Sequence, residues 1–191
     1  MATKKLATRH LIGRVAECLI EAYGVISSGG LLDGFRPGVD MDHKDLIFDE
    51  VGGYRNVYAQ VKCATQLINN CVRCHVQVGS KPIPADPSFV YIFCWLDLKA
   101  MDLIRIWVVP SPDFNRLAYR SFSARSRFAL AFSAKAAGDP KWDKFLVDKH
   151  SLGPRLLEIA LAAPRRKTSN RLNLGTTLAI RARLDAERKA A

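Results

Sequence analysis

The chain has 191 residues, of which 49% are hydrophobic and 9% aromatic, so it can bury the core of one domain with appendages. No apolar run reaches the roughly 18 residues of a membrane-spanning helix, and the N-terminus lacks the apolar segment of a secretory signal. Lys and Arg total 29 against 18 Asp and Glu, and the net charge of +11 favours a polyanionic partner, either nucleic acid or an anionic membrane surface. The five cysteines are odd in number, which fits reduced thiols, and we expect a cytoplasmic protein with no place in a membrane.

The first third of the chain predicts one helix followed by a β-hairpin. Apolar residues recur at helical spacing over 8–23, and Gly24 can end that helix. Several glycines predict a loop over 25–44. A short apolar run, a glycine-bearing turn and an alternating segment then predict a hairpin across 45–62.

Later segments predict further strands and then helices. The run 89–96 is apolar throughout, which is typical of a strand buried on both faces, and 104–109 is its expected neighbour. Ser111 and Pro112 predict the start of a short helix. The order of helix, strands and helices predicts an α/β fold with a mixed β-sheet flanked by helices. The remaining expected elements are a strand over 71–78, a loop over 79–88, and helical segments over 140–149, 154–163 and 171–189.

Residues 164–191 differ from the rest of the chain in charge. They hold eight basic and two acidic residues and so carry +6 of the net +11. We therefore divide the chain into a domain over 1–163 and a basic helical extension over 164–191. An imperfect apolar stripe in this extension could dock on the domain or on a second copy of the chain in a homodimer. The side chains that we expect to hold nucleic acid, there and in the basic, hydroxyl-rich stretch 121–127, are Arg125, Arg127, Arg165, Arg166, Lys167 and Arg171.

Four polar residues are candidates for chemistry at the hairpin. Glu17 lies on the first helix, Asp45 starts the first strand of the hairpin, and Gln60 and Lys62 lie two apart on its second strand. Strand periodicity places Gln60 and Lys62 on one face and Val61 on the other. Oxygen ligands can hold a hard divalent cation that polarises a phosphodiester, and a lysine can orient the attacking water or stabilise developing charge.

These residues resemble a known nuclease core. The run that begins at Asp45, followed after a glycine-bearing turn by Gln60-Val61-Lys62, resembles the Asp…(Glu/Gln)-x-Lys core of the PD-(D/E)XK nuclease superfamily. Gly13-x-x-x-Glu17 is similar to the helix before this core in Holliday-junction-resolvase-like and restriction-endonuclease-like members. The apolar strand followed by Ile-Trp-Val-Val-Pro-Ser and a helix also looks like uncharacterised prokaryotic members, so the resemblance covers roughly residues 9–118.

The resemblance implies a four-stranded mixed sheet flanked by helices and a magnesium-dependent DNA endonuclease, with manganese as an alternative ion. It further implies that Asp45, Gln60 and the main-chain carbonyl of Val61 hold the metal, with Lys62 as catalytic lysine and Glu17 as auxiliary acid.

Two departures leave alternatives open. Gln60 is neutral and holds a cation less strongly than a carboxylate, so a catalytically inactive nucleic-acid-binding module on the same fold is the second hypothesis. A basic domain that binds a membrane surface or a protein is the third. Four acidic residues lie close together upstream; Asp45 fits the ligand position best because it directly precedes the strand, and Asp40 is the alternative.

Cysteine and tryptophan patterns have other interpretations, which we weigh lower. Residues 71–75 match the C-x-x-C-H haem-attachment pattern, but in a strand the two thiols point to opposite faces. A zinc site that adds Cys63 lacks a second close ligand pair. Of the tryptophans, which could stack on bases, Trp95 and Trp107 are expected to fill the core.

Overall fold

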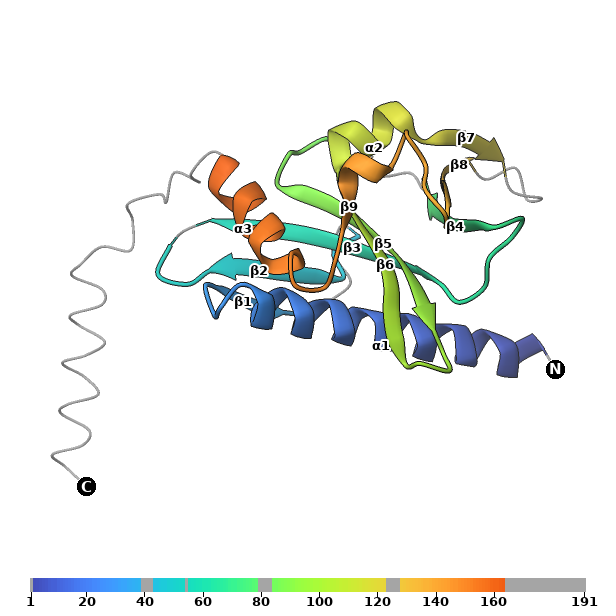
Figure 1. Cartoon of the computed structure of the whole chain (residues 1–191), viewed down its shortest axis with the longest axis horizontal. Helices are drawn as coiled ribbons and strands as arrows, with labels where there is room; N and C mark the ends of the chain where they lie inside the picture. The colour runs from blue at the N-terminus through green and yellow to red at the C-terminus, as the bar shows by residue number, and fades with distance from the viewer. Residues whose placement is uncertain (1, 39–42, 54, 79–83, 123–127, 164–191) are drawn as a thin grey trace, which may run out of the picture.

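The computed structural model describes residues 2–38, 43–53, 55–78, 84–122 and 128–163 (Figure 1). The expected helix over 171–189 and the alternative ligand Asp40 therefore lie outside the described residues. So do the basic side chains expected to hold nucleic acid, which are Arg125, Arg127, Arg165, Arg166, Lys167 and Arg171.

A six-stranded mixed sheet forms the centre of the fold, with strand order β1-β2-β3-β5-β6-β9. Neighbouring strands are antiparallel except β3 and β5, which run parallel. The mixed sheet, the β2–β3 hairpin and the two apolar strands β5 and β6 confirm the prediction, although the sheet has six strands where four were implied. The strands are β1 (Leu32–Phe35), β2 (Leu46–Glu50), β3 (Asn56–Ala64), β5 (Phe89–Asp97), β6 (Asp102–Pro110) and β9 (Leu146–Val147).

A second, three-stranded antiparallel sheet has the order β4-β8-β7. It consists of β4 (Cys71–Gln77), β7 (Tyr119–Phe122) and β8 (Phe128–Lys135). Because β4 belongs to this sheet, the chain leaves the large sheet after β3 and returns to it at β5.

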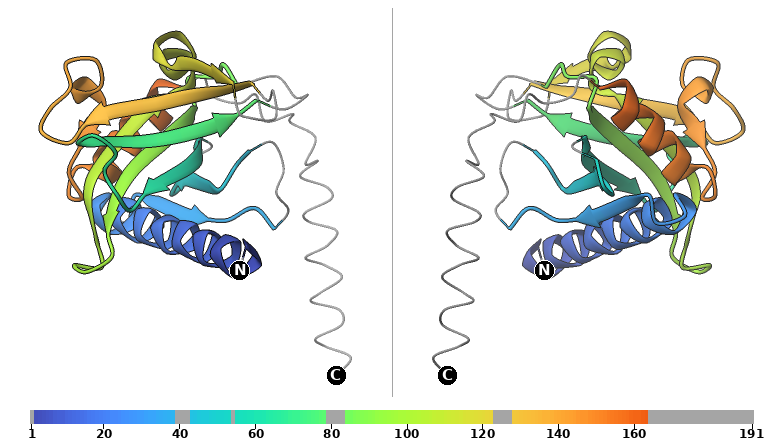
Figure 2. Two further views of the ribbon diagram at one scale, coloured as in Figure 1. Left: turned by 90° about the vertical axis from the view of Figure 1, so that its right-hand side faces the viewer. Right: turned by 90° about the vertical axis from the view of Figure 1, so that its left-hand side faces the viewer.

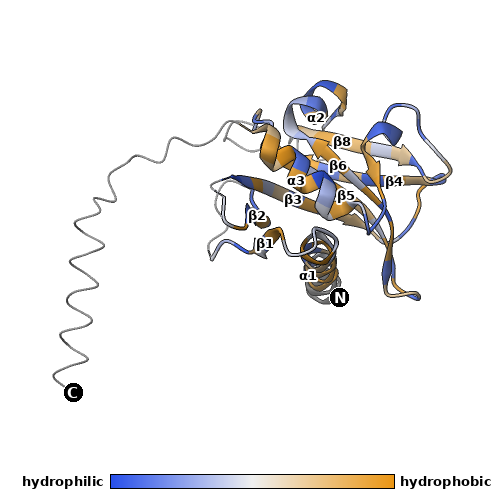
Figure 3. Cartoon of the chain, turned by 60° about the vertical axis from the view of Figure 1, so that its left-hand side comes forward, coloured by the Kyte–Doolittle hydropathy of each residue, from blue (hydrophilic) through white to orange (hydrophobic). Residues whose placement is uncertain are grey.

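Helices and the small sheet cover opposite faces of the large sheet (Figures 1 and 2). On one face, α1 (Ala2–Ser27) and α3 (Leu152–Ala162) bury residues such as Ile20 and Leu156. On the other, the small sheet and α2 (Ser111–Leu117) enclose an aromatic cluster in which Phe93 stacks on Phe132 with ring centroids 4.1 Å apart. The central strands are accordingly hydrophobic on both faces (Figure 3). The expectation of helices flanking the sheet is confirmed, with α1 and α3 on one face and α2 on the other, where the small sheet adds a cover that the sequence did not predict.

The tryptophans follow the expectation for core residues. Trp107 and Trp142 are fully buried in the aromatic cluster, and Trp95 is partly buried against it. The two fully buried rings therefore cannot stack on an external base.

Three parts of the predicted element map are wrong. The expected loop 25–44 contains β1, and β7 and β8 form strands that the sequence did not predict. Residues 140–149 are not a helix, because the carboxylates of Asp139 and Asp143 accept main-chain N–H bonds that close tight turns; only the 3-10 turn η1 (Asp143–Phe145) and β9 follow. Within the part of the chain that the structure describes, no helix is long and apolar enough to cross a membrane.

A close contact between α1 and α3 fixes the position of the first helix. The main-chain N–H of Gly153 donates to Ser27 Oγ at 2.7 Å. A Cβ atom at Gly153 would lie 2.3 Å from Ser28 N and 2.4 Å from the carbonyl oxygen of Gly24. Only glycine fits between these backbones. The prediction that Gly24 ends the first helix is therefore wrong: Gly24 forms part of this contact, and α1 continues to Ser27.

Gly153→Ala should destabilise the protein by about 1–3 kcal/mol or more, because the added methyl group meets backbone atoms that cannot rotate away. Gly13→Ala is the matched control, since a Cβ at Gly13, also in α1, meets nothing within 4 Å. That variant should be more stable by about 1 kcal/mol, because alanine restricts the unfolded chain. Urea denaturation measures both; equal effects of the two substitutions would contradict the proposed contact.

Candidate active site

The site begins where β2 stops pairing with β3. The last paired residues are Leu46 and Ala59, so β3 continues beyond the end of its neighbour. The carboxylate of Asp45, directly before β2, accepts the main-chain N–H of Val61 through Oδ2 at 2.8 Å. In a strand, the N–H and C=O of one residue point to the same edge, so the carbonyl of Val61 lies on the same edge as Asp45. This edge thus gathers a carboxylate and a main-chain carbonyl.

Lys62 and Gln60 approach this edge from one face of β3. Val57, Ala59 and Val61 pack toward α1 and α3, whereas Tyr58 packs toward the small sheet. Gln60 and Lys62 therefore share the face of Tyr58, as their spacing predicts. Lys62 Nζ lies 3.6 Å from Asp45 Oδ2.

Gln60 is nearly buried, with 6% of its surface exposed. Its Oε1 atom is fully buried and has no hydrogen-bond partner among the described residues. An unsatisfied buried carbonyl costs about 1–3 kcal/mol, which a bound ligand or ion would offset. The Gln60 side chain does not line the open cleft that Asp45 faces.

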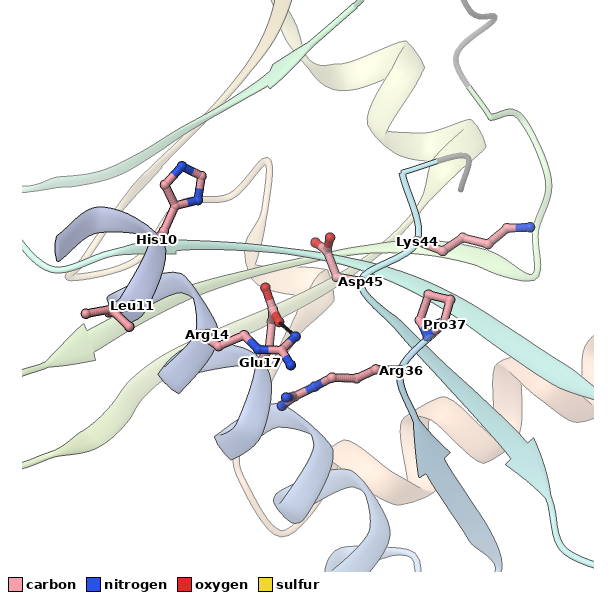
Figure 4. Close-up of a pocket in the computed structure, with 8 residues that line it drawn as sticks. All are labelled: His10, Leu11, Arg14, Glu17, Arg36, Pro37, Lys44 and Asp45. Carbon is pink, nitrogen blue, oxygen red and sulfur yellow. Dashed lines mark hydrogen bonds and ion pairs between the residues drawn. The ribbon is translucent and has the colours of Figure 1, made fainter. Parts of the chain in front are cut away.

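Glu17 reaches the site from α1. Its carboxylate pairs with Arg14 one turn earlier at 3.3 Å and turns toward Asp45 (Figure 4). Partial burial is the main cause that raises the pKa of Glu17 above its ordinary value, and the negative charge of Asp45 adds to it, against the opposing effect of Arg14. The negative charge of Asp45 therefore disfavours the ionisation of the neighbouring Glu17.

Both carboxylates line a cleft of about 640 Å³ whose other polar walls are basic (Figure 4). Arg36 is held there by Cys18 Sγ at 2.9 Å and Glu21 at 3.2 Å; the bond to Cys18 is the main cause that raises its pKa. Cations beside carboxylates suit a phosphate group near a metal ion. The polar lining residues are His10, Arg14, Glu17, Arg36, Lys44 and Asp45.

The sequence predicted only part of this lining. Arg14 could have been found from its i, i+3 spacing to Glu17, which places the two side chains together on a helix. Lys44 adjoins Asp45 in sequence. The position of Arg36 could not be predicted, because it directly follows β1, and the sequence predicts a loop there.

Two thiols hold the main chain of Lys62 from opposite faces of the sheet. Cys74 Sγ and Cys94 Sγ both lie near the Lys62 carbonyl oxygen, at 3.7 and 3.8 Å. Burial raises the pKa of Cys74 to about 12, so this thiol stays protonated and donates. β4 (Cys71–Gln77) confirms the strand expected over 71–78, with Cys74 buried and Cys71 turned to the other face.

The structure thus places Lys62, the Val61 main chain and Glu17 around Asp45; of the predicted residues, Glu17 and Asp45 line the cleft, whereas the side chains of Lys62 and Gln60 do not. Among the described residues, no cluster of three or more His, Cys, Asp or Glu side chains could hold a metal. Any metal there would depend on two carboxylates supplemented by carbonyl oxygens. In comparisons with known proteins, neither a family model nor a curated protein matches the chain.

Glu17→Gln removes a carboxyl whose pKa folding raises. Because the folded protein holds this proton more tightly than the unfolded chain, the group favours folding below its ordinary pKa of 4.5, and this contribution is lost as the pH rises through the raised value. We expect the free energy of unfolding of the parent, minus that of the variant, to fall across this window in urea titrations at a series of pH values.

Glu158→Gln controls for the loss of an ion pair. Glu158 forms the same i, i+3 pair with an arginine, Arg155, but lies exposed on α3. A pH profile for Glu17→Gln no different from that for Glu158→Gln would show that Asp45 and burial do not act on Glu17.

Proposed function

We propose that the chain is a divalent-metal-dependent DNA endonuclease of the PD-(D/E)XK type. The observation that carries the proposal is the position of Asp45, which lines one open, basic cleft together with Glu17 and lies 3.6 Å from the ammonium group of Lys62. The order of these residues along the chain is that of the nuclease core which the sequence resembles.

The donor groups fit a hard cation such as Mg²⁺ or Mn²⁺. Asp45, the carbonyl of Val61 and Oε1 of Gln60 are oxygen ligands, which such ions prefer. Repulsion between Glu17 and Asp45 would be relieved by a positive ion between them, and the unpartnered Oε1 of Gln60 would gain the contact that it lacks. When bound, the ion would polarise the phosphodiester and make hydroxide available from water.

The protein's own residues would supply orientation and charge. Lys62 Nζ, held beside Asp45, would position the attacking water and stabilise the charge that develops on the phosphate oxygens. Arg14, Arg36 and Lys44 would hold the flanking phosphates along the wall of the cleft. The basic segment 164–191 would add affinity for DNA without taking part in the chemistry.

A catalytically inactive DNA-binding module on the same fold is the second candidate, and one observation favours it. Asp45 Oδ2 already accepts Val61 N–H and lies near Lys62, so its charge is partly satisfied without a metal. Gln60 adds no charge. Incubation of supercoiled, linear, branched and single-stranded DNA with Mg²⁺ or Mn²⁺, and then with chelator, separates the two: metal-dependent nicking belongs only to the nuclease.

Lys62→Ala should lower the rate of cleavage by about 10²–10³-fold, because it removes a charge that acts in the transition state. The fold should persist, since 31% of the Lys62 side chain is exposed. Lys144→Ala, which removes an exposed lysine far along the chain, is the control. A Lys62→Ala protein that nicks supercoiled DNA as fast as the control would remove Lys62 from the mechanism.

Gln60→Glu should bind Mg²⁺ more tightly, because a carboxylate adds a full negative charge to the ligand set. Without metal the variant should be less stable than the parent, since the new charge is buried, and Mg²⁺ should restore more stability to it. Calorimetric titration and melting with and without Mg²⁺ measure both effects. Gln77→Glu adds the same charge at an exposed site, and affinity no higher than in that control would argue that position 60 is not a ligand.

A further inference from the structure

The outward face of the small sheet is exposed or partly exposed at its described residues, except at Ala129, which is buried. Strand pairing defines this face: Arg73 pairs with Ser133, and His75 pairs with Ala131, which in turn pairs with Tyr119. The residues of this face alternate along the chain with side chains that are buried against the large sheet. The buried side chains are Val72, Cys74 and Val76 of β4 and Leu130, Phe132 and Ala134 of β8. We name it the outer face; its residues are Arg73, His75, Gln77, Tyr119, Ser121, Ala129, Ala131, Ser133 and Lys135.

The charge on these strands has one sign. β4, β7 and β8 contain no acidic residue, and their charged residues are Arg73, Arg120 and Lys135, all exposed. At one end of the face, the carboxylates of Asp139 and Asp143 accept hydrogen bonds from the main-chain N–H groups of Lys135, Asp139 and Lys141. A one-sided distribution of this kind complements a polyanion.

The centre of the outer face is shallow. The residues of β8 that alternate onto this face are small: Ala131 and Ser133 are partly exposed, whereas Ala129 is buried. Alanine is also a poor strand former. Small residues along a central strand leave room for another chain to approach the backbone closely. This trough is bordered by Arg73 and His75 on β4 and by an aromatic ring on β7.

That ring belongs to Tyr119, which is 55% exposed although it is a large aromatic residue. Lys141 Nζ lies 3.6 Å from the ring centroid, and this contact holds the ring in place. An exposed, fixed ring beside cations is the arrangement on which unpaired bases stack while their phosphates meet the positive charges. A duplex hides its base faces, so the ring selects for a single strand.

One strand of the small sheet lies against the strand that carries Lys62, but the outer face is separate from the proposed cleavage site. Cys74 on β4 donates to the main chain of Lys62, so β4 crosses directly over the strand that carries the lysine. The small sheet lies on the side of the large sheet opposite α1 (Figure 2). None of the residues that line the cleft belongs to the outer face.

We propose that the outer face of the small sheet binds single-stranded DNA, with a base stacked on Tyr119 and phosphates held by Arg73 and Lys135. The identity of the polyanion as DNA rests on the proposed function, whereas binding itself needs neither metal nor Lys62. The nuclease would then hold an unpaired strand on this face while the cleft engages the phosphodiester to be cut.

The test measures fluorescence anisotropy of labelled oligothymidylate, and of a duplex of equal length, with the full chain in chelator. Tyr119→Leu should weaken binding of the single strand by roughly 5- to 100-fold, and Tyr119→Phe, which keeps the ring, should not. The difference should persist at high salt, where binding through basic segments is suppressed. Arg73→Ala should flatten the dependence of log K on log salt by about 0.7.

Lys99→Ala, on the exposed turn between β5 and β6, is the charge control. Ala131→Glu places a negative charge on the central strand of the outer face. This variant should lose single-strand binding, while its circular dichroism spectrum remains that of the parent. Equal affinity of Tyr119→Leu and Tyr119→Phe, or an Arg73→Ala effect no larger than that of Lys99→Ala, overturns the proposal. The proposal is also overturned if Ala131→Glu changes only the self-association of the protein, measured by sedimentation, and leaves single-strand binding unchanged.

The two proposals can fail separately. Tyr119-dependent binding in chelator without any metal-dependent cleavage by the parent leaves this inference standing and removes the nuclease. The opposite result is cleavage that depends on Lys62 but is unchanged by Tyr119→Leu and Ala131→Glu, with no single-strand binding in chelator. That result supports the nuclease and removes this inference.

Discussion

One main-chain amide organises the candidate site. Because β2 ends before β3 does, the N–H of Val61 has no strand partner on that edge, and a buried N–H without a partner is costly. The carboxylate of Asp45 satisfies it. This bond fixes an anion at the edge of the sheet, and the lysine at position 62, on the next residue, then falls within reach of that anion. The same contact that completes the sheet therefore also creates a polar centre.

The charges around this centre are unevenly matched. Glu17 adds a second carboxylate at a position where its ionisation is disfavoured, although Arg14 pairs with it. Arg36, by contrast, is anchored by groups outside the immediate site, Cys18 and Glu21. Under the proposed function, a bound positive ion would offset the repulsion between the two carboxylates, and a phosphate would meet the fixed cations of the cleft. Perturbed carboxyls in clefts are common at functional sites for this reason.

The sequence predicted the parts of the fold whose signals are local. The apolar run of β5, the alternation of β3 and the spacing of α1 each follow from periodicity within one segment. β8 was missed because its alternating alanines and serine carry little strand preference, and its pairing with β4 depends on residues far away in the chain. The segment 140–149 has helix-forming residues, but two aspartates bonded to the main chain turn it elsewhere. Of the site, Asp45 and Lys62 could be placed from their strands, whereas the burial of Gln60 and the approach of Arg36 depend on packing between elements that no short segment encodes.

The placement of β4 in the small sheet, between two strands of the large sheet in sequence, also governs the order in which the protein can assemble. β4 is made early, but the strand that pairs with it, β8, follows only after β5, β6, α2 and β7. Until β8 is available, the aromatic face of the large sheet around Phe93 and Trp107 has no complete cover. Contacts between segments so distant in the chain form slowly, because closing a long loop costs entropy before any contact compensates for it. During synthesis, a ribosome-bound chain that ends before Phe128 therefore leaves this aromatic surface exposed, and exposed apolar surface of this kind favours aggregation.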